Sequence, residues 1–103
     1  TAVGEGLVDF HTYAKRYAEL APGAPLNIET ISGFAKPFPF LKDEFWKPYA
    51  QAPAASFAGW LAMMKRGKKM EPFKAPNKEA EAAYQKGELE RSVKALRAAT
   101  SAV

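Results

Sequence analysis

The sequence predicts a mainly α-helical protein, a small irregular bundle of about three to five helices with a long extended central segment rich in proline and aromatic residues. Apolar residues recur at three- and four-residue spacing toward both ends of the chain, which is typical of helices with one apolar face. Six of the eight prolines lie between these ends, within residues 37–76, and eight of the thirteen aromatic residues lie within residues 34–60. The length of 103 residues, without cysteine, predicts a single small domain over residues 1–103 with a thin core.

Local signals predict four helices. They are predicted over residues 7–21, 28–34, 53–66 and 78–99, with irregular chain over 35–52 and 67–77. In the first, Leu7, Phe10 and Ala14 begin an apolar stripe at helical spacing. Pro22 ends that helix because proline cannot continue it and restricts the residue before it. In the second, Asn27 is a candidate N-cap.

The third helix has a signal at each end. Pro53 suits the start of a helix, because its missing N–H costs nothing there. Lys65 and Arg66 suit the last turn, where cations are favoured, and Gly67 suits the C-terminal cap. The uncharged run over residues 52–64 is shorter than the roughly 20 residues that a membrane-spanning helix needs.

The fourth helix is predicted to begin after Asn77, a good N-cap, and to present Leu89 and Val93 on an apolar face. Gly87 leaves two alternatives: the helix tolerates it at about 1 kcal/mol, or the chain turns there into a helical hairpin. Residues 84–96 resemble the inter-helix turn of a tetratricopeptide repeat, and no second copy follows. The resemblance implies a helical hairpin at this point.

The central segment is too aromatic for a flexible linker and has too many prolines for a long helix. A single helical turn is expected over residues 42–47. An extended segment of this kind lowers its free energy by laying its rings on an apolar surface, either the protein's own helices or a partner. Residues 34–60 are therefore the predicted partner-binding segment. The candidate contact residues in it are Phe38, Phe40, Phe45, Trp46, Tyr49 and Trp60.

The net charge of +4 is unevenly distributed along the chain. Residues 1–35 carry −2, residues 36–78 carry +6, and residues 79–103 are balanced. Such asymmetry favours contact with an anionic surface, although a solvated basic loop has the same signature. The basic segment 65–78 is the second predicted partner-binding segment. Its candidate contact residues are Lys65, Arg66, Lys68 and Lys69.

No set of residues with a catalytic pattern is found. His11 is the only histidine and there is no cysteine, which argues against a zinc site. The carboxylate pairs are interpreted as solvated helix starts and faces; they are Asp43–Glu44, Glu79/Glu81 and Glu88/Glu90. We therefore expect no enzyme activity, no cofactor and no metal.

These observations favour a non-catalytic accessory or linker subunit of a larger protein assembly, in its most specific form peripheral to an energy-transducing membrane complex. Its partners would be other subunits, with a membrane surface as a further contact. One alternative is a nucleic-acid-binding domain that uses the basic segment, and another is a binder of an apolar ligand or pigment. For localisation, the start at Thr1 fits removal of an initiator methionine and equally cleavage of a targeting peptide. The high alanine content and the absence of cysteine are compatible with an organelle-imported or periplasmic chain peripheral to a membrane.

Overall fold

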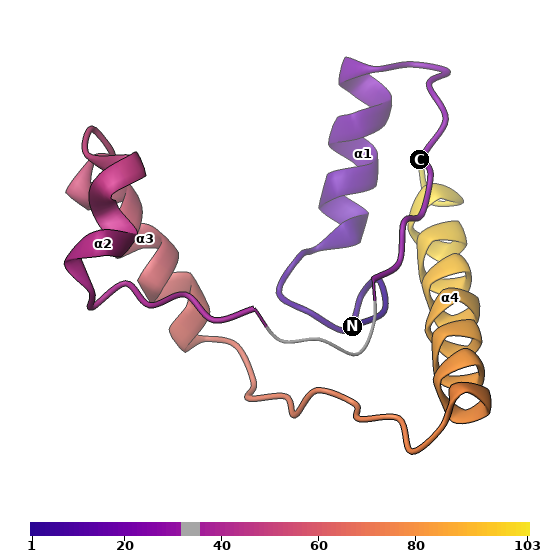
Figure 1. Ribbon diagram of the computed structural model, residues 1–103. Coiled ribbons are helices and arrows are strands. Elements are labelled where there is room, and N and C mark those ends of the chain that lie inside the picture. The colour runs from indigo at the N-terminus through magenta and orange to yellow at the C-terminus, as the bar shows by residue number, and fades with distance from the viewer. Residues whose placement is uncertain (32–35) are drawn as a thin grey trace. The chain divides into compact units, whose positions relative to one another are not determined.

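The computed structural model describes residues 1–31 and 36–103 and confirms the mainly helical fold (Figure 1). Of these described residues, 1–31 and 72–103 form one compact unit, here the terminal unit, and 36–71 form another, the central unit. No strand occurs within the described ranges. The helices are α1 (Phe10–Leu20), α2 (Asp43–Trp46), the 3-10 helix η1 (Lys47–Tyr49), α3 (Ala54–Lys65) and α4 (Lys78–Thr100).

Helix α1 begins at an aspartate cap. Asp9 Oδ1 accepts hydrogen bonds from the backbone N–H groups of His11 (3.1 Å) and Thr12 (3.2 Å). The Thr12 hydroxyl donates to Asp9 Oδ2 at 2.6 Å. These bonds satisfy amides that have no partner within the helix, so α1 begins at Phe10 rather than at the predicted Leu7.

After α1 the chain reverses at Pro22 and Gly23. Gly23 has φ +76°, a left-handed conformation that a residue without Cβ adopts at no steric cost. The Tyr17 hydroxyl donates a hydrogen bond to the Pro25 carbonyl oxygen at 3.1 Å and so ties the returning chain to α1.

Residues 24–31 contain no helix, so the prediction of a helix over 28–34 is wrong for its described part; residues 32–34 lie outside the described residues. Ile28, Thr30 and Ile31 are β-branched, which lowers their helix propensity and favours extended backbone. Asn27 makes no capping hydrogen bond to a described residue. The preference of these β-branched residues for non-helical backbone therefore outweighs the capping potential of Asn27.

Helix α4 is continuous over 23 residues and passes through Gly87 without a break. Of the two alternatives at this glycine, the structure contains the uninterrupted helix, and the implied helical hairpin is absent. At its start, Asn77 Oδ1 accepts the N–H of Ala80 at 2.8 Å, as the sequence predicts for this cap.

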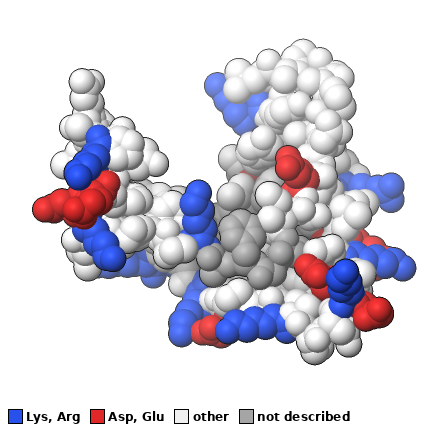
Figure 2. Space-filling model, in the orientation of Figure 1, with Lys and Arg blue, Asp and Glu red and all other residues white. Residues whose placement is uncertain are grey.

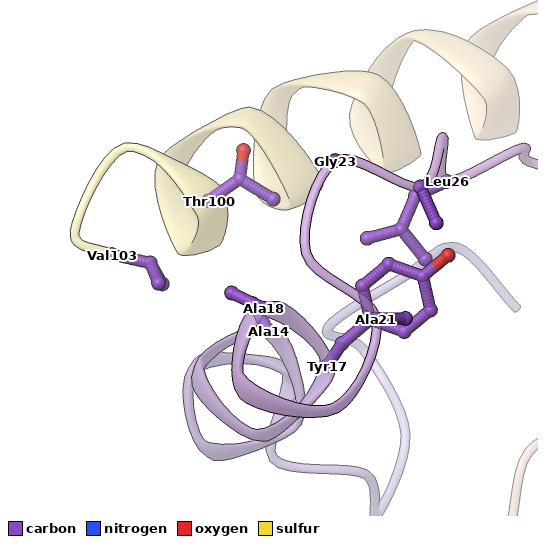
Figure 3. A pocket seen from close by; sticks show the side chains of 9 residues that line it. Ala14, Tyr17, Ala18, Ala21, Gly23, Leu26, Thr100 and Val103 are labelled. Atoms are coloured by element: carbon purple, nitrogen blue, oxygen red, sulfur yellow. The ribbon is translucent and has the colours of Figure 1, made fainter.

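Helices α1 and α4 pack through small residues. Ala14 on α1 and Ala99 on α4 are buried, at 3% and 1% exposed. Figure 3 shows the small side chains of α1 facing the end of α4, with Thr100 and Val103 across a cavity of about 310 Å³. The two helices therefore meet closely at alanines and leave open space beside them.

The N-terminal segment lies on α4 and buries polar rather than apolar groups of that helix. The Val3 N–H donates to Ser92 Oγ at 3.0 Å, and Arg91 Nε donates to Glu5 Oε1 at 2.6 Å. Glu88 is only 2% exposed, and its Oε1 lies 3.0 Å from the Thr1 nitrogen. The interpretation of Glu88 as part of a solvated face is therefore wrong, because residues 1–5 cover it.

In the central unit, the expected long extended segment over 35–52 is not confirmed. Residues 43–49 are helical, as α2 followed directly by η1, with Pro48 in the first turn of η1, where its missing N–H is not needed. Helix α3 begins at Ala54, after Pro53, and ends at Lys65.

Candidate functional site

Seven aromatic side chains gather in the central unit, and we call them the aromatic cluster. They are Phe38, Phe40, Phe45, Trp46, Tyr49, Phe57 and Trp60. The tightest contact joins Trp46 and Phe57, whose ring centroids lie 4.8 Å apart at an angle of 85°. Such edge-to-face pairs place the positive edge of one ring against the negative face of the other and are worth about 0.5–1.5 kcal/mol beyond burial.

Helical spacing and one hydrogen bond position the rings. Phe57 and Trp60 are three residues apart on α3, so they share a face, and their centroids are 5.7 Å apart. The Trp46 indole N–H donates to the Phe40 carbonyl oxygen at 2.7 Å, which fixes the end of α2 to the residues that precede the helix. Phe40 in turn contacts Phe57 at 5.5 Å.

The rings surround an open cavity and none of them is buried. The cavity has a volume of about 250 Å³ and is lined by the aromatic cluster and Ala52. Phe38 and Tyr49 are each 53% exposed, and the other rings are half-buried. No residue of the described central unit, 36–71, is fully buried.

The structure brings together all six aromatic residues that the sequence singles out as contact candidates. It adds Phe57, which is not among the contact candidates that the sequence predicts. The signal was present, since Phe57 precedes Trp60 by three residues on the same helix.

The four basic candidates lie at the last residue of α3 and directly after it, and they do not line the cavity. They are Lys65, Arg66, Lys68 and Lys69, and all four are exposed. Lys69 forms an ion pair with Glu71 at 2.8 Å, and no ion pair with a described residue engages the other three. Figure 2 shows both signs of charge spread over the visible face, separated by wide uncharged areas.

The aromatic residue that follows the basic candidates is occupied elsewhere. Phe73 stacks on Tyr84 of α4 with centroids 4.1 Å apart and ring planes 10° apart. Trp60 lies in the aromatic cluster. Within the described residues, Trp60 and Phe73 therefore each already contact another aromatic ring.

Shifted pKa values occur where the N-terminal segment and the α1 cap make their hydrogen bonds. The hydrogen bond from Arg91 lowers the pKa of the Glu5 carboxyl, and those from Thr12 lower the pKa of the Asp9 carboxyl. Partial burial raises the pKa of the Tyr84 phenol, and the nearby Glu88 carboxylate adds to the effect. Each shift reflects a structural contact of the terminal unit.

Two further features were searched for within the described ranges. No group of three His, Cys, Asp or Glu residues there is arranged to hold a metal ion. Among the helices of the described residues, none combines the length and the apolar character that crossing a membrane requires.

The chain matches no protein-family model, no curated protein and no solved structure.

Proposed function

We propose that the chain is a non-catalytic accessory or linker subunit of a larger protein assembly and that the aromatic cluster is its main contact with a neighbouring protein. One observation carries the proposal: seven aromatic side chains gather on one surface, and none of them is buried. Large aromatic side chains that contact both their own chain and a partner are typical of the centre of protein interfaces.

The free energy available from covering this cluster is large. An aromatic side chain buries about 150–250 Å² when it is fully enclosed, at about 25 cal/mol per Å². Covering a further ~300 Å² over the seven rings would therefore contribute roughly 7 kcal/mol before the costs of association. A partner surface with an apolar projection that fills the cavity would gain most of this.

The basic candidates would act at the edge of the same interface. Because Lys65, Arg66 and Lys68 are exposed, they would attract an acidic partner surface over several ångströms without making a large contribution to affinity. They would raise the rate of association and set the orientation of binding.

Affinity purification from the native source tests this role. We expect the tagged wild-type chain to bring down a partner in fixed stoichiometry. Phe38→Ala and Tyr49→Ala should lose it, because these rings are the most exposed of the cluster and contribute least to the fold of the central unit. Tyr13→Ala is the matched control, since Tyr13 is 46% exposed on α1 and lies outside the cluster.

Retention of the partner by both Phe38→Ala and Tyr49→Ala would refute the proposal. A chain that is recovered from its native source as a free monomer would refute it equally.

The cavity favours one second candidate, the binding of a small apolar ligand. All lining side chains are aromatic apart from Ala52, and the Trp46 indole N–H is already bonded to a carbonyl oxygen. A flat apolar molecule would therefore fit better than a polar one. Titration with naphthalene, followed by the fluorescence of Trp46 and Trp60, tests this candidate; saturable quenching supports it, and a linear response excludes it.

A further inference from the structure

Residues 26–31 are rich in residues that favour strands and contain no helix, turn or bend, and no described strand lies beside them. The segment is extended, and Pro25 precedes it at a position where proline is tolerated in strands. Leu26 and Ile28 are half-buried, while Asn27 and Glu29 are exposed. Over residues 26–29 this alternation matches the two-residue period of a strand with one face on a packed layer, and Thr30 and Ile31 are exposed.

The backbone hydrogen-bonding groups of this segment are unused. None of the N–H groups of residues 26–31 donates a hydrogen bond to a described residue, and none of their carbonyl oxygens accepts one. The hydrogen-bonded backbone group nearest before the segment is the Pro25 carbonyl oxygen, which accepts a hydrogen bond from the Tyr17 hydroxyl. An exposed row of unpaired N–H and C=O groups is a ready template for pairing with another strand.

A groove beside the segment would receive the side chains of such a strand. It has a volume of about 400 Å³ and is lined by residues 26–28 on one side and by five residues of α4 on the other, which are Leu89, Val93, Leu96, Arg97 and Thr100. The contact of α4 with α1 and the N-terminal segment buries the neighbouring stripe, which contains Ser92 and Ala99. The most apolar stripe of α4 is therefore left open next to an unpaired strand edge.

We propose that residues 26–31 form the edge of a β-sheet that is completed by an extended strand of a partner protein, whose alternate apolar side chains enter the groove on α4. Backbone pairing supplies affinity in this mode of recognition, and pockets for alternate side chains supply specificity. An occupant that was a helix would fill the groove and leave the six amides of the segment without partners.

A synthetic peptide probes this site directly. The probe is an acetylated, amidated heptapeptide with the sequence of residues 25–31, because it has the required alternation. In an antiparallel register with Ile28 opposite Ile28, its apolar side chains fall on the α4 side and Asn27 lies across from Glu29. Hydrogen exchange of the labelled chain is then measured residue by residue.

Strand pairing predicts a pattern that apolar contact alone does not. Successive N–H groups of a strand point to opposite edges, so one added strand protects every second amide of residues 26–31. We expect exchange at these alternate amides to slow by about tenfold or more at saturating peptide. Exchange at the amides between them should change little.

Two N-methylated versions of the probe serve as controls that leave the protein unaltered. In each peptide, methyl groups replace the hydrogens of every second amide, and the two peptides differ in which set is methylated. Only the peptide that is methylated on the edge facing residues 26–31 therefore loses its pairing donors. One version should bind and the other should not. The proposal is overturned if the unmodified peptide gives no alternate protection, or if both methylated versions protect the chain equally.

This inference rests on residues outside the aromatic cluster, so the two proposals can fail separately. The Tyr49→Ala chain, which should lose its partner at the cluster, should bind the peptide as the wild type does. Val93→Lys, which places a charge in the groove, should weaken peptide binding and leave the aromatic cluster unaffected.

Discussion

The two units of the chain contrast in what they bury. The terminal unit contains all five buried residues of the described ranges, Ala2, Ala14, Glu88, Ser92 and Ala99, although its long helix is mostly polar. The central unit contains seven aromatic side chains in one cluster and buries none of them. The unit with the larger apolar side chains is therefore the one with the less complete core.

Side-chain size explains this contrast. Alanine and serine allow backbones to approach closely, so α1, α4 and the N-terminal segment exclude water with few apolar atoms. Large rings need surfaces on several sides before they are enclosed, and a unit with one three-turn helix and two short ones offers too few. The terminal unit thus contains a finished small core, and the central unit leaves its aromatic side chains half-buried or exposed.

The largest expected loss of stability comes from a substitution in the core of the terminal unit. Ala99→Leu should destabilise the terminal unit by about 1–3 kcal/mol, because Ala99 is 1% exposed and the added carbons have no space. Urea unfolding followed by far-UV circular dichroism measures the loss. Ala98→Leu, on the exposed side of the same helix turn, is the control and should change little. Equal stability of the two variants would show that the α1–α4 contact is not a packed core.

The next largest loss of stability is expected from removing one ring of the aromatic cluster. Trp60→Ala removes a ring that contacts Phe38, Phe40 and Phe57. We expect a cost of about 1–2 kcal/mol, below the roughly 3–5 kcal/mol of a fully buried tryptophan, because Trp60 is only half-buried. Urea unfolding followed by Trp46 fluorescence gives the value, with Trp60→Phe as control. A loss above about 4 kcal/mol would mean that the central unit has a closed core of its own.

Lowering the pH should reduce the stability of the terminal unit more than that of the central unit. Glu5 and Asp9, whose pKa values are lowered by hydrogen bonds, both lie in the terminal unit. Their contribution to stability is present above the unfolded pKa, near 4, and is lost as the pH falls through the lower folded pKa. Below about pH 4 we therefore expect α-helical circular dichroism to weaken. Glu5→Gln with Asp9→Asn should remove most of this dependence, and an unchanged acid transition in that variant would contradict the assignment.

The smallest effect on stability is expected from the basic candidates. Replacement of all four with glutamine should change the free energy of unfolding by less than about 0.5 kcal/mol, because their one ion pair with a described residue is exposed. The rate of association with the captured partner should nevertheless fall, most strongly at low salt. A rate that is unaffected at every salt concentration would exclude a role for these cations in binding. The replaced residues are Lys65, Arg66, Lys68 and Lys69.

Sequence reasoning worked where structure follows from local signals. The sequence predicts helices over 53–66 and 78–99, and the structure has Ala54–Lys65 and Lys78–Thr100, because Pro53 and Asn77 act within one turn of the helix. The residues of the aromatic cluster could likewise be identified from composition, because the density of aromatic residues over 34–60 is visible in the sequence, and their role as partner contacts stays a prediction.

Long-range contacts are what the sequence could not supply. The capping potential of Asn27 suggests a helix, whereas Leu26 and Ile28 pack beside α4 in extended backbone, a contact between residues more than 60 positions apart. Glu88 is one of several similar carboxylates, and it is buried only because residues 1–5 fold onto it. Which stripe of α4 is buried therefore depends on such long-range contacts and not on how apolar each stripe is.

Thermal unfolding of the isolated chain, followed by tryptophan fluorescence, tests the central claim most directly. Both tryptophans of the sequence, Trp46 and Trp60, lie in the aromatic cluster, so the signal reports on the central unit alone. A cluster that is completed only by a partner predicts a broad transition of low midpoint and a blue shift of the emission when the partner binds. A single sharp transition above about 60 °C for the isolated monomer, coincident with the loss of helical circular dichroism, would contradict the account.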